Sequence, residues 1–384
     1  MNNRERFFNI LDNKEIDRTP FFPDITTWYE NSRKNIGDEE IFGPGVYIPD
    51  GIDFHQRKSN LKGKHANFTF LDYYREYDWG LPVHIYDWYS EEYTNEVKKI
   101  TKRKGRKKYI KYKTPIGEVS RTLTMGAEGS WVPTKFFVQE YSDLKILKEV
   151  FKNRKIIPDY SNIEKFLNET KGFGVCDVVI WRSPFGKLVH EFMGFEEVVY
   201  GLHDKEKKKI ILDFLKFMEA QDLKVIKHAA NSPAKIVIIS DHADETLISP
   251  RQYEQYCIPY YQKACKILHD NNMYVSTHLD GNFKSYFPIL HDTHFDLLDG
   301  CTPAPMFNYE VEDLANLVDE DLNAYCGVPS TLFTQELQTQ QLVDFGIRIA
   351  KSFDRRVIAN IGDILPPRGN IEQVIEVGKA IMDY

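Results

Sequence analysis

Apolar and polar positions follow a regular order from about residue 170 to the end of the chain. Short, nearly continuous apolar runs, typical of strands buried on both faces, alternate with longer amphipathic stretches, typical of helices. This alternation indicates a parallel sheet built from βα units. The predicted strands lie at 175–181, 235–240, 274–277, 295–298, 323–326 and 357–359, and the predicted helices at 205–228, 249–269 with a bend near Pro259, 283–291, 311–318, 342–352 and 370–382.

The first 150 residues are less regular. We interpret residues 1–60 as an N-terminal approach segment, with a helix at 3–11 and a short strand at Phe21 and Phe22. Residues 66–145 are predicted to form a β-rich insertion, in which 97–114 makes a hairpin around Gly105. The pattern favours an α/β fold, a (β/α)8 TIM barrel forming one domain over 1–384. A doubly wound open sheet is the alternative, but no GxGxxG or GxxxxGK[ST] motif supports a nucleotide-binding version.

The charge balance argues against nucleic acid and membrane surfaces as partners. The 384 residues carry 50 basic and 57 acidic side chains, a net charge of −7. The segment 97–114 departs from this balance because it is rich in lysine and arginine. We interpret it as a solvated edge hairpin whose lysines prevent association with other sheets. Contact with nucleic acid or with an acidic protein is the alternative. The basic residues of this segment are Lys98, Lys99, Lys102, Arg103, Lys104, Arg106, Lys107, Lys108, Lys111 and Lys113.

Cysteine usage and the start of the chain indicate a cytoplasmic protein. The five cysteines have no CxxC spacing, so we expect reduced thiols. The sequence begins without an apolar signal region, and no apolar run is long enough to span a membrane.

A histidine and two carboxylates stand directly after predicted strands. His278 and Asp280 follow the strand at 274–277, and residues two apart in a strand point to the same face. Asp363 follows the strand at 357–359. Because the carboxyl ends of parallel strands meet at one mouth, we predict that these three side chains bind one divalent ion. The donor set permits Zn²⁺, Mn²⁺ or Fe²⁺. An acid/base pair is the other interpretation.

Further ionisable groups follow other strands. Each alone is compatible with a helix cap or a hydrogen bond within a loop. Several at successive strand ends favour a functional site, because a purely structural barrel does not need them there. We predict Asp241, His242 and Asp299 as catalytic residues, and Arg182, Asp244 and Asn282 as substrate-binding residues.

An ordered series of short motifs resembles the uroporphyrinogen decarboxylase superfamily, which includes the corrinoid-dependent methyltransferases of methanogens and acetogens. The resemblance covers nearly the whole chain and implies a (β/α)8 barrel with its site at the carboxyl mouth. The motifs lie at 4–7 with 17–21, 114–117, 183–185 with 193–196, 248–250 with 259–261, 278–282, 302–306 and 362–367.

Two departures from the family pattern narrow the expected function. True decarboxylases carry an arginine motif that holds a porphyrin's carboxylates, but residues 21–28 contain no arginine. The zinc methyltransferases use His-x-Cys and a later Cys as ligands, where this chain has His278, Asp280 and Asp363. Carboxylates are harder ligands than thiolates, so we expect activation of an oxygen or nitrogen group rather than a thiol.

The resemblance therefore implies a methyltransferase that moves a methyl group between a small methylated substrate and a corrinoid protein. It implies a divalent metal, with zinc as the family's ion, a corrinoid carried on a partner protein, and a homodimer. One alternative is a decarboxylase of a small carboxylic acid or a uroporphyrinogen-like substrate, with Arg182 holding a carboxylate. Another is a non-catalytic ligand-binding barrel, because one fold supports many functions.

Overall fold

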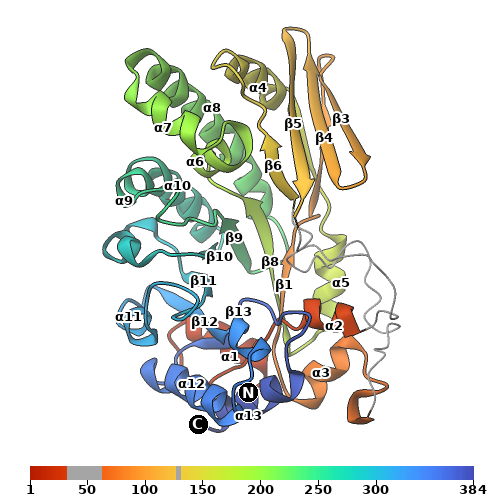
Figure 1. Cartoon of the computed structure of the whole chain (residues 1–384), viewed down its shortest axis with the longest axis vertical. Coiled ribbons are helices and arrows are strands. Elements are labelled where there is room, and N and C mark those ends of the chain that lie inside the picture. The colour runs from red at the N-terminus through yellow and green to blue at the C-terminus, as the bar shows by residue number, and fades with distance from the viewer. Residues whose placement is uncertain (33–62, 127–130) are drawn as a thin grey trace.

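The computed structural model describes residues 1–32, 63–126 and 131–384. Residues 33–60 of the predicted approach segment lie outside this range. The centre of the molecule is a sheet of seven strands, all parallel to their neighbours (Figure 1). In spatial order they are β1 (Leu81–Ile85), β8 (Gly174–Trp181), β9 (Ile236–Ser240), β10 (Tyr274–His278), β11 (Leu297–Cys301), β12 (Asn323–Pro329) and β13 (Ile358–Gly362).

A short segment near the N-terminus closes this sheet. Phe21 forms a parallel bridge with Ala359 of β13, and the backbone N–H of Phe22 donates to the Ala359 carbonyl at 2.8 Å. On the other side, the N–H of Gly80, next to β1, donates to the Phe21 carbonyl at 2.8 Å. The segment therefore takes the place of an eighth strand between β13 and β1. The segment predicted as a strand at Phe21 and Phe22 forms a single bridge, at Phe21. The predicted (β/α)8 barrel is confirmed.

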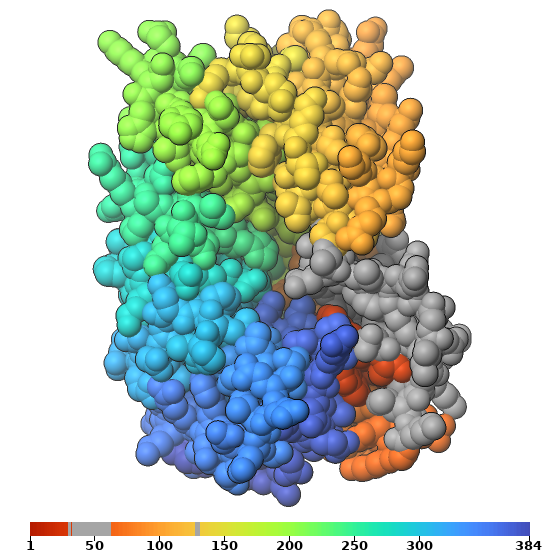
Figure 2. Space-filling model, viewed as in Figure 1, coloured from red at the N-terminus to blue at the C-terminus, as the bar shows by residue number. Residues whose placement is uncertain are grey.

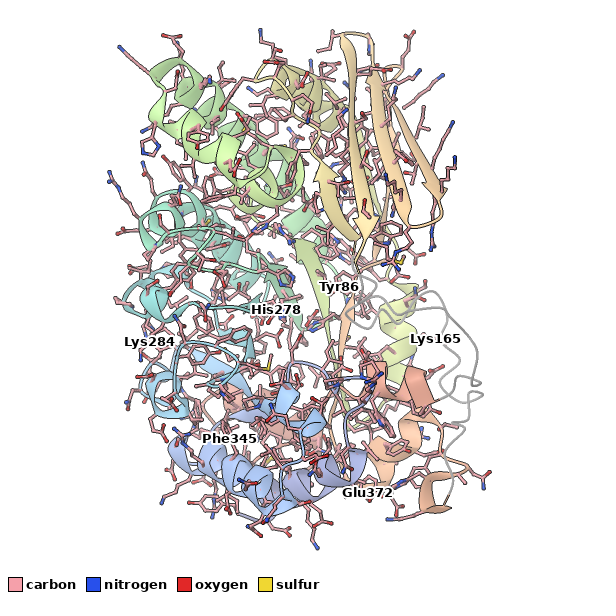
Figure 3. The ribbon with its side chains drawn as sticks, viewed as in Figure 1. Tyr86, Lys165, His278, Lys284, Phe345 and Glu372 are labelled. Carbon is pink, nitrogen blue, oxygen red and sulfur yellow. The ribbon has the colours of Figure 1, made fainter. Side chains whose placement is uncertain are left out.

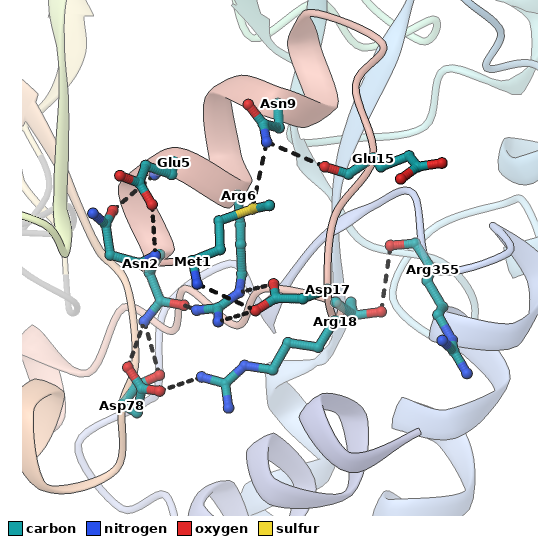
Figure 4. Close-up of polar contacts among 12 residues, drawn as sticks. Met1, Asn2, Glu5, Arg6, Asn9, Glu15, Asp17, Arg18, Asp78 and Arg355 are labelled. Atoms are coloured by element: carbon teal, nitrogen blue, oxygen red, sulfur yellow. Dashed lines mark hydrogen bonds and ion pairs between the residues drawn. The ribbon is translucent and has the colours of Figure 1, made fainter.

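Ion pairs hold the N-terminal segment in place (Figure 4). The Arg6 guanidinium binds both carboxylate oxygens of Asp17, at 2.6 and 2.8 Å, a bidentate geometry that fixes orientation. Asn3 donates to the carbonyl of Asp78 at 2.8 Å, and Arg18 pairs with the Asp78 carboxylate. These contacts set the position at which the chain enters the barrel.

Most helices begin close to the predicted residues. The Asp204 carboxylate caps α8 by accepting from the backbone N–H groups of Glu206 and Lys207, and Asn370, where the last helix is predicted to begin, caps α13. The helices are α1 (Asn3–Leu11), α2 (Thr26–Ser32), α3 (Phe70–Glu76), α4 (Asp143–Lys152), α5 (Ser161–Glu169), α6 (Pro184–Lys187), α7 (Phe195–His203), α8 (Lys205–Ala229), α9 (Pro250–Gln252), α10 (Ile258–His269), α11 (Val311–Ala315), α12 (Thr339–Ser352) and α13 (Ile371–Asp383).

Two prolines alter the predicted helices. The bend expected near Pro259 takes the form of a widened π-helical turn, η3 (Tyr253–Cys257), directly before α10. The helix predicted at 283–291 is wrong. Pro288 has no N–H to donate, and the segment forms tighter 3₁₀ turns, η4 (Lys284–Ile289) and η5 (His291–Thr293). Comparable short turns are η1 (Gly63–His65), η2 (Leu188–Phe192, π-helical) and η6 (Ser330–Thr334).

An antiparallel insertion separates β1 from β8 along the chain (Figure 1). The hairpin predicted at 97–114 is confirmed, and it turns at Gly105, whose φ of 56° suits glycine. Like charges stand directly opposite one another in this hairpin, as in the pairs Lys98 with Lys113 and Lys104 with Lys107. The insertion contains the pair β2 (Tyr89–Tyr93) and β7 (Arg154–Pro158), and a sheet of β3 (Lys98–Lys104), β4 (Lys107–Thr114), β5 (Gly117–Met125) and β6 (Trp131–Lys135).

Buried ion pairs attach the insertion to the barrel helices. Arg154 of β7 pairs with Glu91 of β2 at 3.1 Å and lies 3.8 Å from Asp222 of α8. Lys187 of α6 also pairs with Asp222, at 2.7 Å, and Asp222 is only 1% exposed. Figure 2 shows the orange and yellow surface of the insertion at the upper end of the molecule, beside the green surface of α7 and α8.

All five cysteines are buried, unpaired thiols, as the sequence predicts. None of the helices in the described ranges is both long and apolar enough to cross a membrane.

Candidate functional site

Three side chains at the carboxyl mouth of the barrel form a potential metal-binding group. His242, His278 and Asp280 each offer a ligand atom, and these atoms all lie within 4.8 Å of one another. His278 is the last residue of β10, and its ring centroid is 4.7 Å from that of His242. In Figure 3, His278 lies near the centre of the molecule, whereas Lys284 lies toward its outside. Two imidazoles and one carboxylate are a donor set suited to a divalent ion with an open coordination position.

A buried carboxylate orients His278. The two residues are register partners in β10 and β11, and Nδ1 of His278 lies 2.6 Å from Oδ2 of Asp299. With Nδ1 directed at Asp299, Nε2 is the nitrogen that would bind a metal after losing its proton, an arrangement common around metal-binding histidines. Burial alone would lower the pKa of His278, but Asp299, with Asp363 and Asp280, raises it to about 9. Gly300 gives the ring its space, because a Cβ there would lie 2.7 Å from the imidazole. Asp299, which the sequence analysis predicts as a catalytic residue, is therefore the hydrogen-bonding partner of His278.

His242 lies within the metal-binding group although the sequence suggests a catalytic role. Burial, together with the positive charges of His278 and Arg182, holds its pKa well below the usual range. Its imidazole is therefore neutral at pH 7, the form that ligates metals. The backbone at His242 has a φ of 46°, unusual for a residue with a side chain. The sharp turn after β9 brings this ring back toward His278.

Asp363 lies at the same mouth, outside the compact group of three. Burial raises the pKa of Asp363 to about 7, with His278 opposing the rise and Asp280 and Asp299 adding to it. These interactions bring Asp363 within electrostatic reach of both predicted partners. Its role as a ligand stays a prediction.

Asp241 and Asp244 make contacts within the protein. Asp241 is fully buried, and its oxygens accept from the Ser183 backbone N–H at 2.8 Å and from the Tyr261 hydroxyl. Asp244 accepts from the backbone N–H of Asn282 at 2.9 Å, which joins the loops after β9 and β10. Arg182 follows β8 with a φ of 43° and lies near enough to His242 to influence its charge. The predicted roles of these four residues in catalysis and substrate binding remain predictions.

The sequence interpretation did not identify a second histidine–carboxylate pair. Nδ1 of His84, in β1, lies 2.8 Å from Oδ2 of Asp177, in β8, and the Nε2 of His84 lies 3.9 Å from Asp299. Burial opposes its charge, but Asp177, then Asp299 and Asp363, raise the pKa of His84 to about 10. A carboxylate inside the apolar run of β8 was an available signal for this pair. His84 lay within the stretch that we interpreted as insertion.

A pocket opens beside this charged group. It reaches from the loop before α2 to the ends of β1 and β13, and Asp299 joins it to the metal-binding group. Carboxylates outnumber the other ionisable groups on its walls. The lining residues are Asp24, Thr26, Phe70, Pro82, Val83, His84, Asp299, Tyr325, Asn360 and Asp363.

A half-buried histidine near the mouth, His190, makes stability depend on pH. Burial, and secondarily the charge of Arg182, lower the pKa of His190 from 6.5 to about 4, and its Nε2 is buried without a hydrogen-bond partner. Between pH 6.5 and 4 the unfolded chain binds a proton at His190 that the folded protein excludes, so stability falls as the pH falls. We expect His190→Gln to reduce this loss by up to about 3 kcal/mol.

Urea unfolding of the parent protein and His190→Gln at pH 7, 5.5 and 4 measures the difference. His203→Gln, at an exposed position on α7, serves as the control. Equal pH dependence in the parent protein and His190→Gln would contradict the assignment.

Comparisons with known proteins agree with this architecture. The family model of uroporphyrinogen decarboxylase (URO-D) matches residues 201–382, which include His242, His278 and Asp280. The sequence matches no curated protein. The fold is similar to that of a methyltransferase from Methanosarcina mazei, with a TM-score of 0.58 and 11% identity over 100% of this chain and 99% of the other. A B12-independent methionine synthase from Shewanella sp. W3-18-1 matches with a TM-score of 0.41 and 12% identity, covering 68% of this chain and 73% of the other. The predicted resemblance to the uroporphyrinogen decarboxylase superfamily is confirmed, and the family match is carried by residues 201–382.

Proposed function

We propose that the protein is a metal-dependent methyltransferase that moves a methyl group between a small methylated substrate and a corrinoid protein. The observation that carries the proposal is the group formed by His242, His278 and Asp280 at the barrel mouth. The family match includes all three residues, and the fold is shared with a protein described as a methyltransferase.

The donor set suits an ion that binds oxygen or nitrogen. His242 and His278 offer imidazole nitrogens, and Asp280 offers a carboxylate oxygen, so the group has no soft thiolate. A divalent ion held there, with zinc as the first candidate, would withdraw electron density from the heteroatom that carries the methyl group. Asp299 contacts the His278 ring at 2.6 Å and would hold it in position.

The decarboxylase alternative receives less support from the pocket. A carboxylic acid substrate needs a cation to hold it, and Arg182 is not among the described residues that line the pocket. Three of the described lining residues are carboxyl groups, Asp24, Asp299 and Asp363, and none is a lysine or an arginine.

The test combines metal analysis with a transfer assay. The purified protein is loaded separately with Zn²⁺, Mn²⁺ or Fe²⁺, and bound metal is measured by mass spectrometry. Methylation of a purified, reduced corrinoid protein is then followed by its absorbance, using methoxy compounds and methylamines as donors. We expect one bound ion per chain and a transfer that a chelator abolishes and added metal restores. Full transfer by the metal-free protein would contradict the proposal.

A further inference from the structure

We propose that the pocket beside the metal-binding group holds a positively charged ammonium group, so that the substrate is a small organic cation. This inference rests on the proposed function, because it names the class of substrate that the same site accepts. The pocket walls combine carboxylates, an unsatisfied buried acceptor and two aromatic rings.

Carboxyl groups outnumber basic side chains on the described pocket wall, where Asp24, Asp299 and Asp363 accompany His84. His84 and His278 each already contact a carboxylate, Asp177 and Asp299 respectively. Asp24 and Asp363 are further carboxylates on the pocket wall. Among the residues that the structure describes, neither forms an ion pair with a lysine or arginine. A cationic ligand would favour the ionised form of both carboxyl groups, whereas an anionic ligand would disfavour it.

The unpaired side-chain oxygen of Asn360 indicates that the ligand carries a hydrogen-bond donor. Asn360 lines the pocket and is only 3% exposed. Its Oδ1 atom is buried and has no hydrogen-bond partner. A buried acceptor without a donor is destabilising, so such an atom generally has a partner in the occupied site. An ammonium N–H is a donor that satisfies Asn360 and the carboxylates together.

Aromatic rings complete the pocket. Phe70 and Tyr325 lie on its wall and are 5% and 6% exposed. The face of an aromatic ring attracts a cation, and the attraction strengthens where water is excluded. The ammonium end would lie against Asp24 and Asn360. The methylated oxygen or nitrogen would extend past Asp299 toward His278.

The test uses three methoxy compounds of similar size and different charge: 2-methoxyethylammonium, 2-methoxyethanol and methoxyacetate. Binding to the metal-free protein is measured by calorimetry at pH 7.5. We expect the ammonium compound to bind at least about tenfold more tightly than the alcohol, and methoxyacetate to bind most weakly. Equal binding of the three compounds, or tightest binding of methoxyacetate, would overturn the inference.

A substitution localises the effect. Asp24→Asn keeps an acceptor for the Thr26 N–H, which donates to Asp24 at 2.9 Å, but removes the charge. It should reduce the affinity for 2-methoxyethylammonium about tenfold and leave that for 2-methoxyethanol unchanged. Asp270→Asn, at an exposed carboxylate at the end of α10, is the matched control. Circular dichroism establishes that each variant is folded, and unchanged ammonium binding by folded Asp24→Asn would overturn the inference.

The two proposals fail separately. If the charge series shows no preference while the metal-loaded protein methylates a corrinoid protein from neutral or anionic donors, the inference falls and the proposed function stands. If 2-methoxyethylammonium binds as expected but no donor supports methylation, the proposed function falls and the cation pocket stands.

Discussion

Substituting His278 by alanine is expected to reduce metal affinity and methyl transfer by about 100-fold or more, because the change removes one of three proposed ligands. Asp299→Asn should have a smaller effect in the same direction, about 10-fold to 100-fold in metal affinity. Asp299 touches the imidazole through its 2.6 Å contact and acts by positioning it. The graded order distinguishes a ligand from its supporting residue.

Metal content and transfer rate, measured on the same preparations, test both variants. His203→Ala, which removes an exposed imidazole on α7, is the matched control and should retain the full metal content. Full metal occupancy in His278→Ala at submicromolar free metal would contradict the assignment of His278 as a ligand. A loss for Asp299→Asn larger than that for His278→Ala would contradict the division of roles.

Gly327→Ala is expected to destabilise the fold by about 2–3 kcal/mol, the usual range for an overpacked core. A Cβ at this position in β12 would lie 2.3 Å from the backbone nitrogen of Gly362 and 2.0 Å from Oδ1 of Asn360. Because a backbone atom cannot move aside by changing rotamer, β12 and β13 must move apart to make room for the new methyl group. Because Asn360 lines the pocket, the same change should also weaken ligand binding.

Urea unfolding provides the measurement, with Gly346→Ala in α12 as the control. There the new methyl group would meet only side chains, at 3.0 Å or more, and alanine favours a helix. We expect a clearly lower midpoint for Gly327→Ala than for Gly346→Ala. Equal midpoints would show that the two strands adapt without cost.

The regular part of the fold could be predicted because the local pattern and the tertiary environment agree there. In β9 and β10 the apolar run and the buried position coincide, and at Asn370 the capping residue stands where the helix begins. The 3₁₀ turns at 284–293 could not be predicted from periodicity, since their apolar spacing resembles that of a helix. Pro288 prevents a regular α-helix in this segment, because it has no backbone N–H to donate.

The sequence indicates where the site lies more completely than it indicates which side chains contact one another there. Strand-end position correctly placed His278, Asp280 and His242 at one mouth. It could not separate a ligand from an anchor such as Asp241, because the partners of that carboxylate come from distant helices. It also missed His84, whose β1 strand is short and begins beside aromatic residues that resemble the insertion.

The hairpin of β3 and β4 has a consequence for the conditions under which the protein is handled. Lys98 faces Lys113, Arg103 faces Lys108, and Lys104 faces Lys107 across the two strands. Directly opposed like charges weaken a strand pair, and dissolved anions screen that repulsion over a distance that shrinks as salt is added. We therefore expect this outer sheet to be less stable in dilute buffer than in moderate salt, whereas the stability of the apolar barrel should change little.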